Sequence, residues 1–196
     1  MHKLLKWMGI ILGALLGLLV VAAMVLYALG SAQLNKTRDI EVQTIDIHNN
    51  EATLARGAYL VEVAACTVCH GEDLSGDVEL EDPTIGTIYS SNISGLGATH
   101  SDADLIRAIR HGVDTDGRQL IIMPSQQFIN NFSAEDLGAL IAYLKTVPRV
   151  GTDLPEPQIS FTGRLLVGSG LLGDAIAAEV IDHDQPYPPS NSKSKG

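Results

Sequence analysis

Cysteine is almost absent from this chain. Only Cys66 and Cys69 occur among 196 residues, three positions apart. No further thiol remains for a structural disulfide elsewhere in the sequence. No second cysteine pair is present to complete the four Cys or His ligands that close a structural zinc site. The sequence therefore argues against a disulfide-stapled scaffold and against zinc binding by this pair.

Positively charged residues are also few. The chain has 13 Lys and Arg residues against 23 Asp and Glu residues, a formal net charge of −10. Because nucleic-acid binding depends on basic side chains that neutralise phosphates, this balance excludes nucleic acid as an expected partner. No serine nucleophile elbow, phosphate-binding loop or metalloprotease motif is present either. We therefore expect no catalytic residues.

The most informative segment that the sequence does contain is Cys66-Thr67-Val68-Cys69-His70. Two thiols at this spacing with a histidine directly after them form the attachment signature of c-type haem. Each thiol can bond one vinyl group of the porphyrin, and His70 can ligate the iron. A Cys-x-x-Cys pair is also a thioredoxin-like redox motif, but that interpretation requires a βαβ context, and none is visible.

Methionine and aromatic residues are scarce in the rest of the chain. Met123 is the only methionine after Met24, and Phe, Trp and Tyr make up 5 % of the residues. A haem iron with histidine on one side commonly takes a methionine sulfur on the other, so Met123 is the expected second ligand. A core methionine that fills a gap is the alternative. A buried porphyrin would also supply the core volume that aromatic side chains usually provide.

One long hydrophobic run lies at the N terminus. Residues 7–35 carry no charge, and residues 8–29 are almost continuously apolar. A helix of that length spans the roughly 30 Å hydrocarbon core of a bilayer, so residues 1–30 are expected to form a transmembrane anchor. A cleaved secretory signal, which usually has a shorter apolar region, is the alternative. Lys3 and Lys6 precede the run and predict a cytoplasmic N terminus.

The next part of the chain is predicted to be a helical domain. Residues 31–50 are polar and are expected to be a tether. Capping serines and helical periodicity predict three helices, over residues 51–65, 101–112 and 133–144. Residues 71–97 contain glycines, Pro83 and Ser/Asn clusters, which predict a loop. We expect one all-α haem domain over residues 51–150.

Residues 151–196 are predicted to be an extension of this domain. Its apolar stretch from Phe161 to Ile181 is interrupted by Arg164 and Asp174, so it is too broken to span a membrane. The stretch is either a short helix on the haem domain or a docking surface for a partner subunit. From Asp182 onward the residues are polar and rich in Pro, Ser and Lys, which predicts a mobile tail.

The order of these features resembles a class I cytochrome c over residues 51–150. More specifically, the chain resembles the mono-haem subunits of bacterial membrane-bound dehydrogenases and respiratory complexes. The segments that carry this closer resemblance are Ser91-Asn92-Ile93-Ser94, Asp116-Gly117-Arg118, Met123-Pro124 and Phe132 to Leu144. The resemblance implies thioethers at Cys66 and Cys69, with His70 and Met123 as axial ligands. It also implies that haem is attached on the outer, periplasmic face of a bacterial membrane.

Further site residues follow from the same resemblance. A loop proline commonly accepts a hydrogen bond from Nδ1 of the ligating histidine, and Pro83 is the candidate. Gly57 and Tyr143 would mark the crossing of the first and last helices. Arg118 would either pair with a haem propionate or be solvated. Four histidines are alternative iron ligands in principle: His48, His100, His111 and His183. Each is instead expected at the surface or as a helix cap, and His111 in particular suits a helix C-terminus.

Together these features predict an electron carrier rather than an enzyme. With both axial positions filled, the single covalent haem c can only change oxidation state. The glycines of the anchor and the extension favour permanent partners, so we expect a subunit of a respiratory or photosynthetic quinol-oxidising complex. The alternatives are a cytochrome subunit of an outward-facing alcohol, aldehyde or sugar dehydrogenase, and a haem-based sensor. Six acidic residues after the haem motif are either a solvated loop or a docking face for a basic redox partner.

Overall fold

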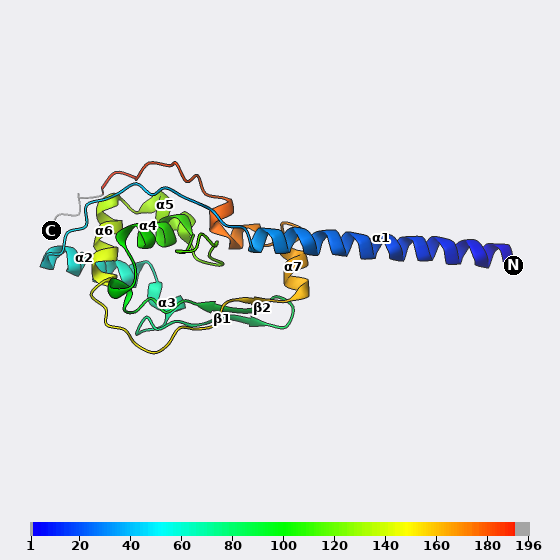
Figure 1. Ribbon diagram of the computed structural model, residues 1–196, viewed down its shortest axis with the longest axis horizontal. Helices are drawn as coiled ribbons and strands as arrows, with labels where there is room; N and C mark the ends of the chain where they lie inside the picture. The colour runs from blue at the N-terminus through cyan, green and yellow to red at the C-terminus, as the bar shows by residue number, and fades with distance from the viewer. Residues whose placement is uncertain (1, 191–196) are drawn as a thin grey trace.

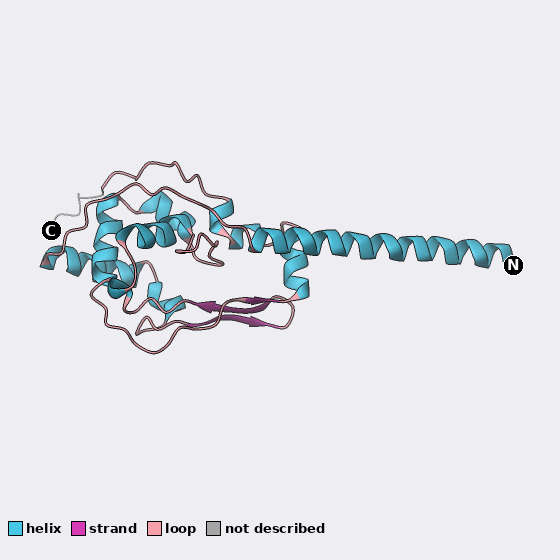
Figure 2. Cartoon of the chain, in the orientation of Figure 1, coloured by secondary structure: helices cyan, strands magenta, loops and turns pink. Residues whose placement is uncertain are grey.

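The computed structural model describes residues 2–190 and has an elongated shape. Helix α1 (His2–Leu34) projects from one end of a helical domain, as Figure 1 and Figure 2 show. Its most apolar 18-residue window has a mean hydropathy of 2.8 and no buried residues, so the helix is long and apolar enough to cross a membrane. The segment predicted as an anchor, residues 1–30, thus belongs to a single helix that continues to Leu34. Gly30 is the only buried residue of this helix.

The domain is built from five α-helices, several of which begin at a side-chain cap. They are α2 (Glu51–Val63), α3 (Cys66–His70), α4 (Asp102–His111), α5 (Ser125–Asn131) and α6 (Ala134–Leu144), with a short 3-10 helix η1 (Leu96–Ala98) before α4. The Ser101 side chain accepts a hydrogen bond from the Asp104 backbone N–H, and Ser133 accepts one from Asp136. The three helices predicted from the sequence are confirmed, while α5 is an element that the sequence pattern did not indicate.

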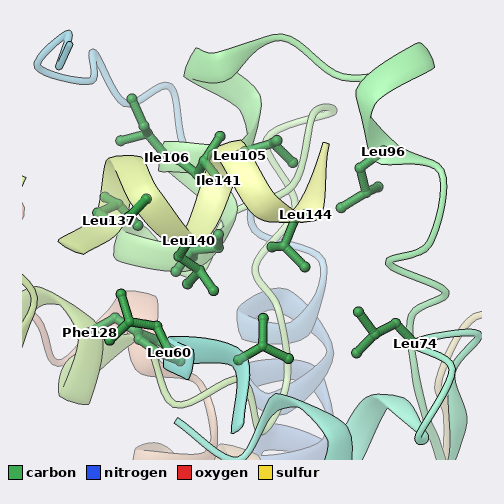
Figure 3. Packing of buried hydrophobic residues seen from close by; sticks show 13 residues of the cluster. Leu60, Leu74, Leu96, Leu105, Ile106, Phe128, Leu137, Leu140, Ile141 and Leu144 are labelled. Carbon is green, nitrogen blue, oxygen red and sulfur yellow. The ribbon is translucent and has the colours of Figure 1, made fainter. Parts of the chain in front are cut away.

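Apolar side chains from these helices meet in one core beside α3. Figure 3 shows Leu60 of α2, Leu105 and Ile106 of α4, and several residues of α6 converging on it. Ile141 is fully buried. Cys66, the first residue of α3, packs against this core.

Helices α2 and α6 cross in close contact at Gly57. A Cβ atom built on Gly57 would lie 2.6 Å from Cβ of Tyr143 and would overlap the carbonyl oxygen of Ala139. Only a residue without a side chain fits this crossing. The predicted meeting of Gly57 and Tyr143 is therefore confirmed.

The segment predicted to be a loop, residues 71–97, contains a β-hairpin instead. Strand β1 (Asp77–Asp82) pairs antiparallel with β2 (Gly86–Ser90), and β3 (Gln158–Ile159) adds a third strand beside β2. The Asp82 side chain accepts hydrogen bonds from the backbone N–H groups of Thr84 and Ile85 and so closes the turn. The hairpin reaches from α3 toward the end of α1 (Figure 1).

The predicted tether, residues 31–50, is not free of the domain. Its first residues belong to α1, and the remainder runs extended along the helices. Val42, Ile45 and Ile47 pack against the hydrophobic core, and Thr37 pairs with Arg118 as an isolated β-bridge. The segment therefore fixes the domain close to the end of α1.

The C-terminal extension also folds onto the rest of the molecule. Helix α7 (Phe161–Gly168) packs against α1 and is followed by two 3-10 helices, η2 (Gly173–Ala175) and η3 (Ala177–Glu179). The Arg110 guanidinium donates to the Gln185 carbonyl and lies 3.9 Å from the centre of the Tyr187 ring. Residues 182–190 thus lie against the domain, contrary to the mobile tail predicted for them, and residues 191–196 of that tail lie outside the described residues.

His111 is buried at the C-terminal end of α4. It is the last residue of α4, as expected, but only 3 % of it is exposed, and its Nδ1 lies 3.1 Å from Nδ1 of His183. Burial lowers the pKa of His111, and the nearby positive charges of His183, Arg110 and Arg107 lower it further, to about 4. The neutral form is therefore the native one at neutral pH.

Replacing Gly57 with alanine should destabilise the domain. Helix propensity alone would raise the free energy of unfolding by about 1 kcal/mol. Because the new methyl group overlaps α6 at the crossing, we expect instead a net decrease in the free energy of unfolding of about 1–3 kcal/mol. Denaturant unfolding of the holoprotein in detergent, followed by circular dichroism, measures whether the free energy of unfolding falls or rises. Gly173→Ala is the matched control, because a Cβ at Gly173 would meet no atom within 4 Å. A stabilised Gly57→Ala variant would contradict the close crossing.

Acid should weaken the fold through His111. Its folded pKa lies below the value of about 6.5 for the unfolded chain, so the unfolded state binds more protons between these values and stability falls as the pH drops through this range. From pH 7 to pH 5 the loss from this residue should be on the order of 1–2 kcal/mol. Unfolding free energies of the native chain and of His111→Gln, compared at the two pH values, isolate the effect. Equal pH dependence in both proteins would refute it.

Candidate haem centre

Both thiols and the histidine of the haem motif lie on α3, a short helix that is separate from α2. The chain leaves α2 at Val63, and Ala65 adopts a left-handed conformation with φ 57° before α3 begins at Cys66. Residues three apart on a helix lie on the same side, so Cys66 and Cys69 can reach one flat group together. Both cysteines are free of disulfide bonds.

The surroundings of the two thiols do not favour thiol–disulfide exchange. Burial raises the pKa of the Cys66 thiol to about 11. Burial also raises the pKa of Cys69, as do a hydrogen bond and the negative charge from Glu79. Reactive cysteines in disulfide oxidoreductases have lowered pKa values, because the thiolate is the nucleophile. The electrostatics of the site therefore disagree with the thioredoxin-like interpretation.

His70 is oriented by a backbone carbonyl from the segment after β2. Its Nδ1–H donates a hydrogen bond of 2.7 Å to the carbonyl oxygen of Ser91. The other ring nitrogen, Nε2, is then the one available to a metal. Burial lowers the pKa of His70, although the Ser91 carbonyl and the charge of Glu79 act in the opposite direction, and the neutral imidazole is the form that ligates metals.

The prediction that Pro83 accepts this hydrogen bond is wrong. Pro83 lies in the exposed turn between β1 and β2. An irregular loop over residues 71–97 would have left the proline free to approach the histidine. The hairpin instead carries Pro83 to its far end, whereas β2 returns the chain to α3 and brings Ser91 beside His70.

Ser91 is held in place by the residues that follow it. The backbone N–H groups of Ile93 and Ser94 both donate to the Leu74 carbonyl. The Asn92 side chain, only 5 % exposed, donates to the Val150 carbonyl at 2.7 Å and accepts from the Ser94 backbone N–H. The sequence pattern of residues 91–94 indicated the resemblance but not this role. Its closely spaced Ser and Asn side chains, which readily bond to nearby backbone, were the available signal.

Met123 contacts the same core as Cys66. It packs against the hydrophobic cluster from a segment that lies between α4 and α5. The preceding residue, Ile122, has φ 68°, and its backbone N–H donates a 2.6 Å hydrogen bond to the Ala175 carbonyl. After it, the Ser125 N–H donates to the Met123 carbonyl at 2.8 Å, at the start of α5.

In the described part of the chain, residues with a strained backbone lie next to the candidate haem-binding residues. The only non-glycine residues with positive φ in that part of the chain are Ala65, Leu74 and Ile122. Ala65 directly precedes Cys66, Leu74 accepts the hydrogen bonds that place the Ser91 segment, and Ile122 directly precedes Met123. A positive φ is costly for a β-branched residue such as Ile122. Strain of this kind concentrates at functional sites, where the surrounding structure enforces it.

The Arg118 side chain forms ion pairs with carboxylates of the protein. Its guanidinium lies 3.0 Å from Asp114 and 3.0 Å from Glu156, with Asp116 at 3.6 Å. The turn from Asp114 to Gly117 brings two of these carboxylates to it, because the Asp114 side chain also accepts from the Arg118 backbone N–H. This arrangement does not support the predicted contact with a haem propionate.

The donor set fits a porphyrin iron better than a bare metal ion. Within residues 2–190 there is no group of three or more His, Cys, Asp or Glu side chains that could hold a metal. A haem iron needs only two ligands from the protein, and the neutral imidazole of His70 and the thioether of Met123 are such a pair. Met123 packs against the same core as Cys66, the first residue of the helix that carries His70.

Comparisons with known proteins agree with this geometry. The cytochrome c family model matches residues 54–148. The chain is 32 % identical over 146 residues to the fructose dehydrogenase cytochrome subunit of Gluconobacter japonicus, an alignment that covers 67 % of this chain and 30 % of the relative. It is 35 % identical over 123 residues to the cytochrome c subunit of a quinone-dependent alcohol dehydrogenase of Gluconacetobacter polyoxogenes, covering 57 % and 26 %.

A third relative is the gluconate 2-dehydrogenase cytochrome c subunit of Pantoea cypripedii, 38 % identical over 108 residues, which cover 50 % of this chain and 24 % of the relative. The chain thus spans about a quarter to a third of the length of these curated relatives. Residues 54–148 are therefore a domain of the cytochrome c family, whose cofactor is covalently attached haem c.

Proposed function

We propose that this chain is a membrane-anchored electron carrier that serves as the cytochrome subunit of a membrane-bound dehydrogenase. The observation that carries the proposal is the placement of Cys66, Cys69 and His70 on α3, with the His70 ring fixed by Ser91. In the proposal α1 crosses the membrane. Lys3 and Lys6 support a cytoplasmic N terminus and a haem domain on the outer side.

The relatives favour a dehydrogenase over a quinol-oxidising complex. All three named above are cytochrome subunits of dehydrogenases, for fructose, alcohol and gluconate. The sequence alone predicts a dehydrogenase subunit only as the alternative to a subunit of a quinol-oxidising complex. Small oxygenated compounds such as sugars, alcohols and sugar acids are accordingly the substrate class that we propose for the catalytic partner.

Each residue of the site has a separate task in this proposal. Cys66 and Cys69 form the thioether bonds, and His70 and Met123 ligate the iron. When bound, the haem supplies a reversible one-electron change of oxidation state. The Ser91 carbonyl keeps the proton on His70 Nδ1 and leaves Nε2 for coordination. Met123 keeps water and small ligands away from the iron.

Replacing Met123 with alanine should open the iron. The ferric protein should lose the long-wavelength absorption band of sulfur ligation, and the ferrous protein should bind carbon monoxide, because residue 123 would no longer offer a thioether to the iron. Absorption spectroscopy of the purified holoprotein measures both changes. Met24→Ala is the control, since Met24 lies in the exposed surface of α1. An unchanged spectrum in Met123→Ala would exclude Met123 as the ligand.

Purification in mild detergent tests the assignment to a dehydrogenase. We expect a catalytic dehydrogenase subunit to accompany the chain, and we expect sugar, alcohol or sugar-acid substrates to reduce its haem. A Cys66→Ser/Cys69→Ser variant should assemble without this absorbance change, because it lacks the thioether attachments. Co-purification with multi-haem and iron–sulfur subunits, with reduction by quinol alone, would contradict the proposal and favour the quinol-oxidising complex.

A further inference from the structure

Two aromatic residues on α1 indicate where the membrane surfaces would lie. Trp7 and Tyr27 are 63 % and 37 % exposed, and they are separated by twenty residues. At 1.5 Å per residue this separation is about 30 Å, the thickness of the hydrocarbon core. Trp and Tyr are enriched at both membrane interfaces. Tyr27 therefore marks the level of the outer surface on α1.

Helix α7 meets α1 at this level. A Cβ atom on Gly30 would overlap the backbone of α7, and one on Gly168 would overlap the backbone of α1, so the two helices are in close contact. The Phe161 ring stacks on the Tyr27 ring with centroids 5.2 Å apart. Figure 1 shows α7 running across the axis of α1 rather than along it. A helix in this position would lie along the membrane surface.

The two sides of α7 differ in what they contact. Gly163 and Val167 are buried, and a Cβ on Gly163 would overlap the Ile85 carbonyl in the turn of the hairpin. Phe161 and, after the helix, Leu171 are instead 60 % and 75 % exposed. Phe161 lies two residues before Gly163 and therefore points away from the hairpin side. The other exposed residues of this segment, Thr162, Ser169 and Gly170, carry no charge, and within residues 2–190 the stacked Tyr27 ring is the aromatic partner of Phe161.

The composition of this segment suits the headgroup region of a bilayer. Residues 158–173 contain one charged residue, Arg164. Its guanidinium lies 6.0 Å from the centre of the Tyr27 ring and 3.4 Å from the Ser31 hydroxyl. Arginine at this depth can extend its charge to lipid phosphates while its stem stays in apolar surroundings. Lipid is favoured over another protein because the exposed Phe161 stacks on Tyr27 of α1 and so joins the exposed apolar surface of that helix.

We propose that the segment from Phe161 to Leu171 lies in the outer interface of the membrane and contacts lipid directly. This inference rests on the membrane-spanning role of α1 proposed above. One spanning helix alone would let the haem domain tilt and rotate. A second contact, beside the first and directed along the surface, fixes the orientation of the domain. The hairpin and α3 are then held at a constant angle to the membrane.

Nitroxide depth measurements test this contact in the full holoprotein. In the holoprotein the native cysteines are bonded to haem, so Leu171→Cys provides the one free thiol for the label. Val78→Cys is the matched control on β1, where Val78 is 47 % exposed, and Leu16→Cys reports the middle of α1. In phosphatidylcholine vesicles, oxygen should relax the labels at Leu171 and Leu16 more than a water-soluble nickel chelate does. The label at Val78 should show the reverse.

Other outcomes of this experiment overturn the inference. A Leu171 label as accessible to nickel as the Val78 label would show that the segment is in water, while a lipid-buried Leu16 label would leave the anchor intact. A nickel-accessible Leu16 label would show that α1 does not span the bilayer. A Leu171 label that is aqueous in lipid vesicles but shielded from both reagents in native membranes would assign the surface to a protein partner.

Haem orientation provides a second measurement. In aligned bilayers, linear dichroism of the haem absorption should be strong for the native chain and should fall toward zero in a Phe161→Glu/Leu171→Glu variant. Val78→Glu, a substitution at another exposed apolar position, should keep the native dichroism. The optical spectrum of each variant shows whether the haem site itself is intact. Unchanged dichroism in the double variant, with an intact spectrum, would refute an orienting role.

Discussion

The hydrogen bond from His70 Nδ1 to the Ser91 carbonyl is the interaction on which the site depends. It joins α3, which carries both cysteines, to the segment that returns from the hairpin. A hydrogen bond on one ring nitrogen sets the tautomer and directs the other toward the metal. The buried Asn92 and the paired hydrogen bonds to the Leu74 carbonyl keep Ser91 in place.

The strained residues show how the fold supports this arrangement. Ala65, Leu74 and Ile122 each occupy a conformation that costs free energy for a residue with a side chain. They lie beside Cys66, the Ser91 segment and Met123, close to a core of aliphatic residues from α2, α4 and α6. Packing of that core, including the close crossing at Gly57, offsets the local strain and positions the candidate ligands.

The sequence predicted the elements that depend on local signals. Serine caps and helical periodicity located the helices at Ser101 and Ser133, and the Cys-x-x-Cys-His motif located the haem site. The hairpin was missed because its glycines, Pro83 and acidic residues resemble a loop, and its pairing with β3 joins residues far apart in the chain. The partner of His70 was missed for the same reason, since Ser91 reaches it only through that hairpin. The burial of His111 depends on the C-terminal extension, which no local pattern places.

The proposed ligation by His70 and Met123 and the proposed membrane contact of α7 would together suit a protein that moves electrons. The central claim is a haem bonded to Cys66 and Cys69. Mass spectrometry of the intact chain from its native membrane tests it most directly. A polypeptide heavier by one haem, with neither cysteine open to alkylation, is the expected result. A chain of unmodified mass with two alkylatable thiols would contradict the claim.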